Sequence, residues 1–196
     1  MKRLIVVAFL AALPMHAVMA QWSVGVELGT ARFGASAHDT ANAGGPQWRP
    51  GDATTIGIRV ARDLGSISVG LRASYGRPGL AATGQGLTVS DKTSGELIEV
   101  ATLVAVRVRG IGPSGAIRAE TGPALHLWKV GDDFRSRIGA LGAVAYEWPV
   151  AGRFSGAIRL EGTVSKSWFE EGDLPPEYDL RLTWRYGMTL GLRYRL

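Results

Sequence analysis

The side chains of this chain that could do chemistry are mainly arginines and glutamates, joined after residue 20 by two histidines, His38 and His126. The charged residues recur singly at every second position of otherwise apolar stretches. Buried charges must be paired, so such a set predicts an interior ion-pair network; the alternative is a cation-lined pore that selects anions. Basic residues outnumber acidic ones, so some arginines would have to meet water, backbone carbonyls or bound anions. The expected interior residues are Glu27, Arg59, Arg72, Glu99, Arg107, Arg118, Glu120, His126, Arg137, Glu147, Arg159, Glu161, Arg181, Arg185 and Arg193.

Catalysis would require a nucleophile or a water molecule activated by a base, usually histidine, with an orienting partner within hydrogen-bond reach. The segment His126-Leu127-Trp128 offers no Ser or Asp at a spacing that shares the face of His126. We therefore expect no catalytic residue. The acidic residues near His38 and at Asp91 and Asp132 lack metal-ligand spacing, so we expect neither a metal site nor a cofactor.

The element best suited to position such residues is the stretch from Leu180 to Leu196. Large apolar side chains occupy every second position, and Arg, Thr and Gly fill the positions between them. A period of two is that of a β-strand, whose successive side chains point to opposite faces. The stretch exceeds the ~5–6 residues of an ordinary strand and suits one that crosses a bilayer, which needs ~9–11.

The same alternation predicts seven earlier strands, near residues 21–32, 56–61, 67–75, 96–109, 115–128, 137–148 and 154–168. Long Gly-rich and polar connections at 34–53, 76–95, 129–135 and 169–179 alternate with short turns at 62–65, 110–114 and 149–153. Pro123 should mark a bulge or kink. A hairpin through 110–114 would place Glu99 opposite His126 and Arg107 near Glu120. The pattern predicts an all-β, eight-stranded antiparallel up-and-down transmembrane β-barrel.

The apolar faces of these strands could point inward, as in a secreted barrel, or outward, against lipid. An eight-stranded barrel has an interior just wide enough to be filled by side chains, and the apolar faces carry too many bulky residues to fit there. We therefore expect apolar side chains outside, with Gly, Ala and the charged residues inside. Interior glycines should leave room for neighbouring guanidinium groups. Aromatic residues should form two interfacial bands, Trp22, Trp148, Phe154 and Tyr194 at one end and Tyr75, Trp168 and Trp184 at the other.

The first twenty residues have the pattern of a secretory signal peptide. Met1-Lys2-Arg3 precedes an apolar run from Leu4 to Leu13, and small residues stand before Gln21, so we expect cleavage near Ala20. An N-terminal anchor helix is the alternative, but the run is too short to span a bilayer. The predicted domains are therefore the signal peptide, 1–20, and the barrel, 21–196. Cysteine is absent, and the spread of the arginines does not favour nucleic-acid binding.

The eight alternating segments and the C-terminal pattern resemble the small eight-stranded outer-membrane barrels of Gram-negative bacteria, the OmpA/OmpX type. The resemblance implies residence in the outer membrane, contact with its lipid, insertion by the barrel-assembly machinery and a monomeric state. The residues that match the assembly signal are Met188, Leu190, Leu192, Tyr194 and Leu196, where Leu196 replaces the usual Phe.

The implied function is a structural or surface-interaction role. The long loops, including the segment around Trp48 and Arg49, would be the contact surface for an extracellular ligand, although Trp48 could instead rest on the barrel rim. The alternatives are a narrow solute or ion pore and a lipid-modifying outer-membrane enzyme.

Overall fold

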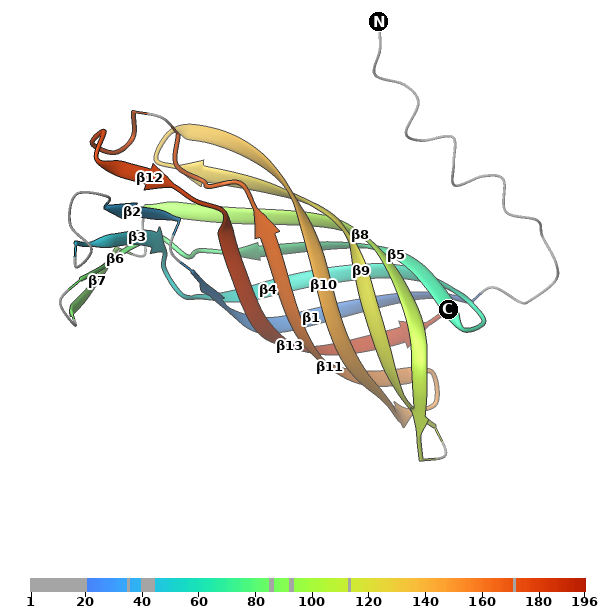
Figure 1. Cartoon of the computed structure of the whole chain (residues 1–196). Coiled ribbons are helices and arrows are strands. Elements are labelled where there is room, and N and C mark those ends of the chain that lie inside the picture. The colour runs from blue at the N-terminus through green and yellow to red at the C-terminus, as the bar shows by residue number, and fades with distance from the viewer. Residues whose placement is uncertain are drawn as a thin grey trace, which may run out of the picture.

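The computed structural model describes residues 21–34, 36–39, 45–84, 87–91, 94–112, 114–170 and 172–196. The predicted signal peptide lies outside these residues. Within them, no helix is long and apolar enough to cross a membrane. Eight long strands close into a barrel: β1 (Gln21–Phe33), β4 (Ala53–Leu64), β5 (Ile67–Gly76), β8 (Gly95–Ile111), β9 (Gly115–Val130), β10 (Asp133–Ala151), β11 (Phe154–Ser165) and β13 (Thr183–Arg195). The predicted eight-stranded all-β barrel is therefore confirmed (Figure 1).

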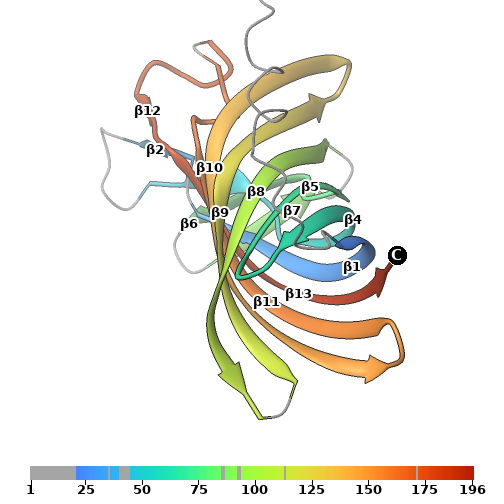
Figure 2. The same ribbon diagram turned by 90° about the vertical axis from the view of Figure 1, so that its right-hand side faces the viewer.

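Consecutive long strands are antiparallel neighbours, and β1 pairs with β13 to close the barrel. Closure leaves no open edge in the barrel, so its backbone donors and acceptors are paired between strands. The three short turns contain glycines with positive φ, Gly65, Gly112 and Gly152, and lie at the same end of the barrel as the C-terminus. Figure 2 views the barrel from that end.

The apolar side chains point outward, as the alternation predicted. Leu190, Ile58 and Val104 are 58 %, 60 % and 44 % exposed, although each lies in the middle of a barrel strand. Their strand neighbours on the other face, such as Thr189 and Arg59, are buried. The direction of the apolar face is therefore confirmed.

The long connections contain a second sheet that the sequence pattern did not predict. Its five short strands are β12 (Tyr178–Leu180), β2 (Ala37–Asp39), β3 (Gln47–Pro50), β6 (Leu80–Gly84) and β7 (Leu87–Asp91), in that order. They lie at the end of the barrel opposite the C-terminus (Figure 1). The prediction that 34–53, 76–95 and 169–179 are loops was therefore wrong in part. The barrel strands bring these connections together, and their backbones then pair with one another.

Several strand ends also differ from the prediction. The expected loop at 129–135 is a tight turn at Gly131, because β9 and β10 both continue to its edges. Trp168 lies after the end of β11 and is buried, so it does not belong to the outward aromatic band. Pro123 interrupts the pairing of β9 with β8, which resumes without a shift of register. The register shift lies instead between Arg107 and Arg109.

The barrel glycines permit close approach of the neighbouring backbone. A Cβ atom on Gly122 would lie 1.8 Å from the carbonyl oxygen of Thr102, and one on Gly187 would lie 2.2 Å from that of Thr30. The expectation that glycine makes room for guanidinium groups was therefore wrong at these positions. Strands that coil tightly around a narrow barrel leave no space for a side chain there.

Candidate functional site

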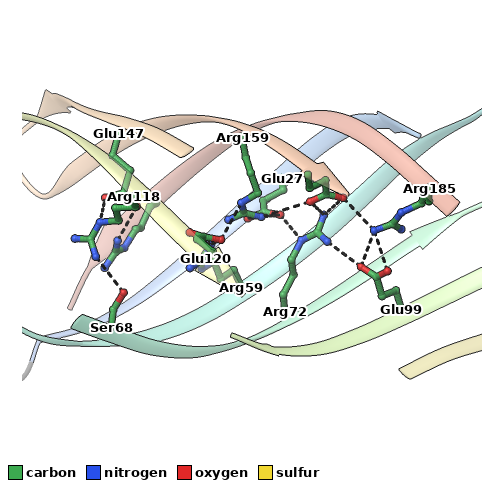
Figure 3. A network of polar contacts seen from close by, with 12 residues as sticks. Glu27, Arg59, Ser68, Arg72, Glu99, Arg118, Glu120, Glu147, Arg159 and Arg185 are labelled. Atoms are coloured by element: carbon green, nitrogen blue, oxygen red, sulfur yellow. Dashed lines mark hydrogen bonds and ion pairs between the residues drawn. The ribbon is translucent and has the colours of Figure 1, made fainter. Parts of the chain in front are cut away.

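The barrel interior contains two groups of ion pairs, to which all eight strands contribute. Inward positions alternate with outward ones, so each strand adds one or more charged side chains to the lumen. The set has six arginines and six carboxylates: Arg59, Arg72, Arg118, Arg159, Arg185, Arg193, Glu27, Asp63, Glu99, Glu120, Glu147 and Glu161. We call these twelve residues the lumen network; Figure 3 shows most of them, together with Ser68.

Arg72 lies at the centre of the lumen network and contacts three glutamates. Its Nε atom is 2.6 Å from Glu27, its Nη1 atom is 3.0 Å from Glu99, and its Nη2 atom is 3.2 Å from Glu161. Arg185 also contacts Glu99 and Glu161, at 2.8 and 3.1 Å. Side-chain exposure is only 2 % for Arg72 and 1 % for Glu99, so these charges depend on one another for compensation.

Glu120 extends the network toward the short turns. Its two carboxylate oxygens lie 2.9 Å from Nη1 of Arg59 and 3.1 Å from Nε of Arg159. Arg159 also reaches Glu27 at 2.9 Å, which connects this group to Arg72.

A second group lies nearer the short turns. Arg118 lies 2.8 Å from Glu147 and donates a hydrogen bond to the hydroxyl of Ser68 at 3.0 Å. Arg193 contacts both Glu147 and Asp63. Asp63 was assigned to a turn and missed, although it continues the inward positions of β4 at two-residue spacing.

His126 is paired as the hairpin register predicted. Glu99 and His126 are opposite each other on β8 and β9, and Nε2 of His126 lies 2.9 Å from Oε2 of Glu99. Both side chains are buried. Within the described ranges, no three His, Asp or Glu side chains are grouped as a metal site would require.

Besides His126, which contacts Glu99, three of the residues expected inside are absent from the lumen network. Arg107 pairs with Arg118 in register, not with Glu120, and it is exposed at the rim next to the register shift. Arg137 lies at the far end, where it contacts Glu170 at 2.9 Å and donates to the carbonyl of Ser167. Arg181 precedes β13 and is exposed. The lumen network therefore has as many carboxylates as arginines, and the expected excess of arginine is not found there.

The barrel interior also contains a small pocket and a cluster of aromatic side chains. Between the groups, a pocket bordered by Glu27, Arg59, Glu147, Arg159 and Arg193 has a volume of about 20 Å³, room for little more than one water molecule. Toward the second sheet, buried aromatic and aliphatic side chains pack together. The members of this aromatic cluster are Ala31, Phe33, Leu97, Trp128 and Trp168.

The residues of the expected assembly signal form the outward face of β13. Met188, Leu190, Leu192 and Leu196 are exposed, and the Tyr194 ring lies 5.0 Å from that of Phe154. Trp48 is half-buried in β3 of the second sheet.

Sequence comparison finds no matching protein-family model and no similar curated protein. Several solved structures of outer-membrane proteins resemble the fold. Neisserial surface protein A (NspA) matches at a TM-score of 0.63 and 8 % identity, over 89 % of this chain and 97 % of its own. Ail of Yersinia pestis, in complex with the heparin analogue sucrose octasulfate, matches at 0.50 and 10 % identity, over 90 % and 99 %. A major outer membrane protein from Thermus thermophilus matches at 0.50 and 15 % identity, over 89 % and 99 %. The chain therefore has the fold of the small eight-stranded outer-membrane β-barrels.

Proposed function

We propose that this protein is an integral barrel of the bacterial outer membrane with a structural or surface-interaction role and no enzymatic activity. The observation that carries the proposal is the outward apolar face of a closed barrel with a charge-paired interior. In water such a face would be a large exposed apolar surface, whereas in a bilayer it is matched by hydrocarbon.

Gln21, Leu196 and the three short turns would face the periplasm, and the second sheet would face outward, because external loops are the long ones in such barrels. The route there would be export by residues 1–20 and insertion by the barrel-assembly machinery through the C-terminal pattern that ends at Leu196. We expect the inserted protein to be a monomer.

The second sheet is the proposed contact surface. Strand β7 is exposed along its whole length, including Leu87 at 67 % and Val89 at 64 %. The described residues at this end include ten acidic and eight basic side chains, so a polyanion such as the ligand of Ail is not the partner that we expect. We expect a neutral or basic extracellular ligand instead.

A closed lumen separates this role from that of a pore. The paired charges of the lumen network, and the aromatic cluster between this network and the second sheet, support a barrel that does not conduct ions. In planar bilayers we expect no stable unitary current from the refolded protein. A steady current that disappears when the lumen is narrowed would instead support an ion or solute channel.

Surface labelling of single-cysteine variants tests membrane residence and orientation. The chain contains no cysteine, so Thr88→Cys in β7 and Ser66→Cys in the β4–β5 turn each introduce one exposed thiol. A membrane-impermeant maleimide should label Thr88→Cys in intact cells and Ser66→Cys only after the outer membrane is permeabilised. Equal labelling of both variants in intact cells, or of neither, would contradict the proposed placement.

A further inference from the structure

The rim that carries the short turns has a concentration of arginine without acidic partners. Arg107, Arg109, Arg153 and Arg195 are exposed there, and Arg62 is half-buried. Among the described residues, none of the five forms an ion pair. We call these five residues the rim arginines.

The carboxylates nearest to this rim are already engaged. Asp63 and Glu147, the described acidic side chains at this end, both bind Arg118 and Arg193 in the lumen network. The lumen network has equal numbers of arginines and carboxylates, and the opposite end of the molecule is slightly acidic. The basic excess of residues 21–196 therefore comes from the rim arginines.

Three of the rim arginines, Arg62, Arg109 and Arg153, lie beside outward aromatic residues, whereas Arg107 and Arg195 are opposite the buried Arg118 and Ser23 and belong to inward rows. The guanidinium of Arg62 is 5.7 Å from the centre of the Trp22 ring. Arg109 is opposite Ile117, which is in turn opposite Tyr146, so Arg109 belongs to an outward row. Arg153 directly precedes Phe154, whose side chain is exposed. Aromatic side chains of this kind lie at the level of the lipid headgroups.

We propose that three of the rim arginines, Arg62, Arg109 and Arg153, bind the phosphate groups of anionic phospholipids in the leaflet next to the short turns. This inference rests on the proposed membrane placement. A guanidinium donates paired hydrogen bonds to phosphate, and the neighbouring apolar face accommodates the acyl chains. A soluble anionic polymer fits less well, because Arg62 and Arg109 lie against the lipid-facing surface. Attraction between a membrane-proximal arginine and an anionic lipid corresponds to roughly a fivefold preference.

Spin-labelled lipids test the proposal in reconstituted bilayers of phosphatidylcholine. The ratio of the association constants of spin-labelled phosphatidylglycerol and phosphatidylcholine should exceed one for the unmodified protein. The combined variant Arg62→Gln, Arg109→Gln, Arg153→Gln should bring it close to one. A control variant at the opposite rim, Arg32→Gln, Arg77→Gln, Arg181→Gln, should leave the ratio as high as in the unmodified protein. Those arginines already pair with Asp52, Glu96 and Asp179.

Two measurements keep the test decisive if the combined variant does not fold. The preference of the unmodified protein should fall as ionic strength rises, and the single variant Arg153→Gln, in an exposed turn, should reduce it in part. A ratio of one for the unmodified protein, or an equal loss in the control variant, would overturn the inference. Binding to peptidoglycan that depends on these arginines, without lipid preference, would also overturn it. Failure to insert into any bilayer would overturn the proposed function as well, whereas insertion without preference would overturn this inference alone.

Discussion

Glu120 shows how strongly a single residue can matter in a paired interior. Its carboxylate is completely buried and is shared by Arg59 and Arg159. Replacing Glu120 by Gln would leave the buried guanidinium of Arg59 with a neutral partner only, and would remove one of the carboxylates of Arg159, which keeps Glu27. Loss of one partner from a buried ion pair costs about 3 kcal/mol or more. We expect Glu120→Gln to lower the free energy of unfolding in urea by that amount and to lower the melting temperature.

A matched substitution at the surface provides the control. Glu96 pairs with Arg77 at 3.0 Å, but the Arg77 side chain is largely exposed. Exposed pairs contribute little, so Glu96→Gln should change the free energy of unfolding by less than about 0.5 kcal/mol. Equal melting temperatures for Glu120→Gln and the unmodified protein would show that the lumen network does not stabilise the barrel.

Asp173 ties the connection after β11 to the barrel outside the proposed membrane region. Burial by itself raises the pKa of this carboxyl, but hydrogen bonds from Arg135 and from the Glu170 amide outweigh burial and hold the pKa below its ordinary value of 3.8. The folded pKa is depressed, so the stabilisation is present above the ordinary pKa and is lost as the pH falls through the folded pKa.

We therefore expect amide hydrogen exchange in residues 166–180, corrected for its intrinsic pH dependence, to rise relative to the barrel strands below about pH 4. Asp173→Asn should cause this loosening already at neutral pH. The exposed pair of Asp179 and Arg181, 3.7 Å apart, offers the control: Asp179→Asn should leave exchange unchanged. Protection that stays constant across the acid range would refute the anchoring role of Asp173.

Which interior contacts could be predicted depended on local register. The Glu99–His126 pair followed from counting outward from a short turn, because a hairpin fixes its own register. The prediction for Arg107 was wrong although the register is the same there, because that register puts Arg107 opposite Arg118 and leaves Ala105 opposite Glu120. Contacts such as Arg72 with Glu161 join strands far apart in the chain and depend on how wide the closed barrel is, which no single segment specifies.

At the scale of strands, glycines mark the places where backbones approach most closely. A Cβ atom added to Gly122 in β9 would lie 1.8 Å from the carbonyl oxygen of Thr102 in β8. Gly122→Ala must therefore displace the backbone of β8 or β9. We expect this variant to refold in low yield or to unfold at a markedly lower urea concentration. Gly142 on the adjacent strand β10 has no atom within 4 Å of such a Cβ, so Gly142→Ala should behave like the unmodified protein. Similar stability of the two variants would contradict close approach as the reason for Gly122.

The strands themselves were predictable because their pattern repeats. Alternation of apolar and polar residues over ten or more positions indicates a β-strand. Apolar outward positions such as Ile58 and Leu190 follow this alternation throughout. The second sheet was not predictable for the opposite reason. Its strands are three to five residues long, and β12 pairs with β2 across more than a hundred residues, so no local sequence pattern indicates which segments pair.

At the scale of the molecule, charge is divided into three zones along the barrel. One rim is basic, the lumen network is balanced, and the end with the second sheet is slightly acidic. The balanced middle zone suits a barrel that remains closed, and the two unlike ends give the molecule a direction relative to a membrane. The total charge of +5 for the whole chain conceals this division.

The central claim is that the outward apolar side chains contact lipid. Spin labels at Leu28→Cys, Ile58→Cys and Leu190→Cys, in mid-strand positions around the barrel, test it after reconstitution in bilayers, with Thr88→Cys as the aqueous reference. We expect the three strand labels to be mobile and to collide frequently with oxygen but rarely with a water-soluble nickel complex, and the Thr88 label to show the reverse. Frequent nickel collisions at the three strand positions, or immobilisation of their labels by protein packing, would contradict the account.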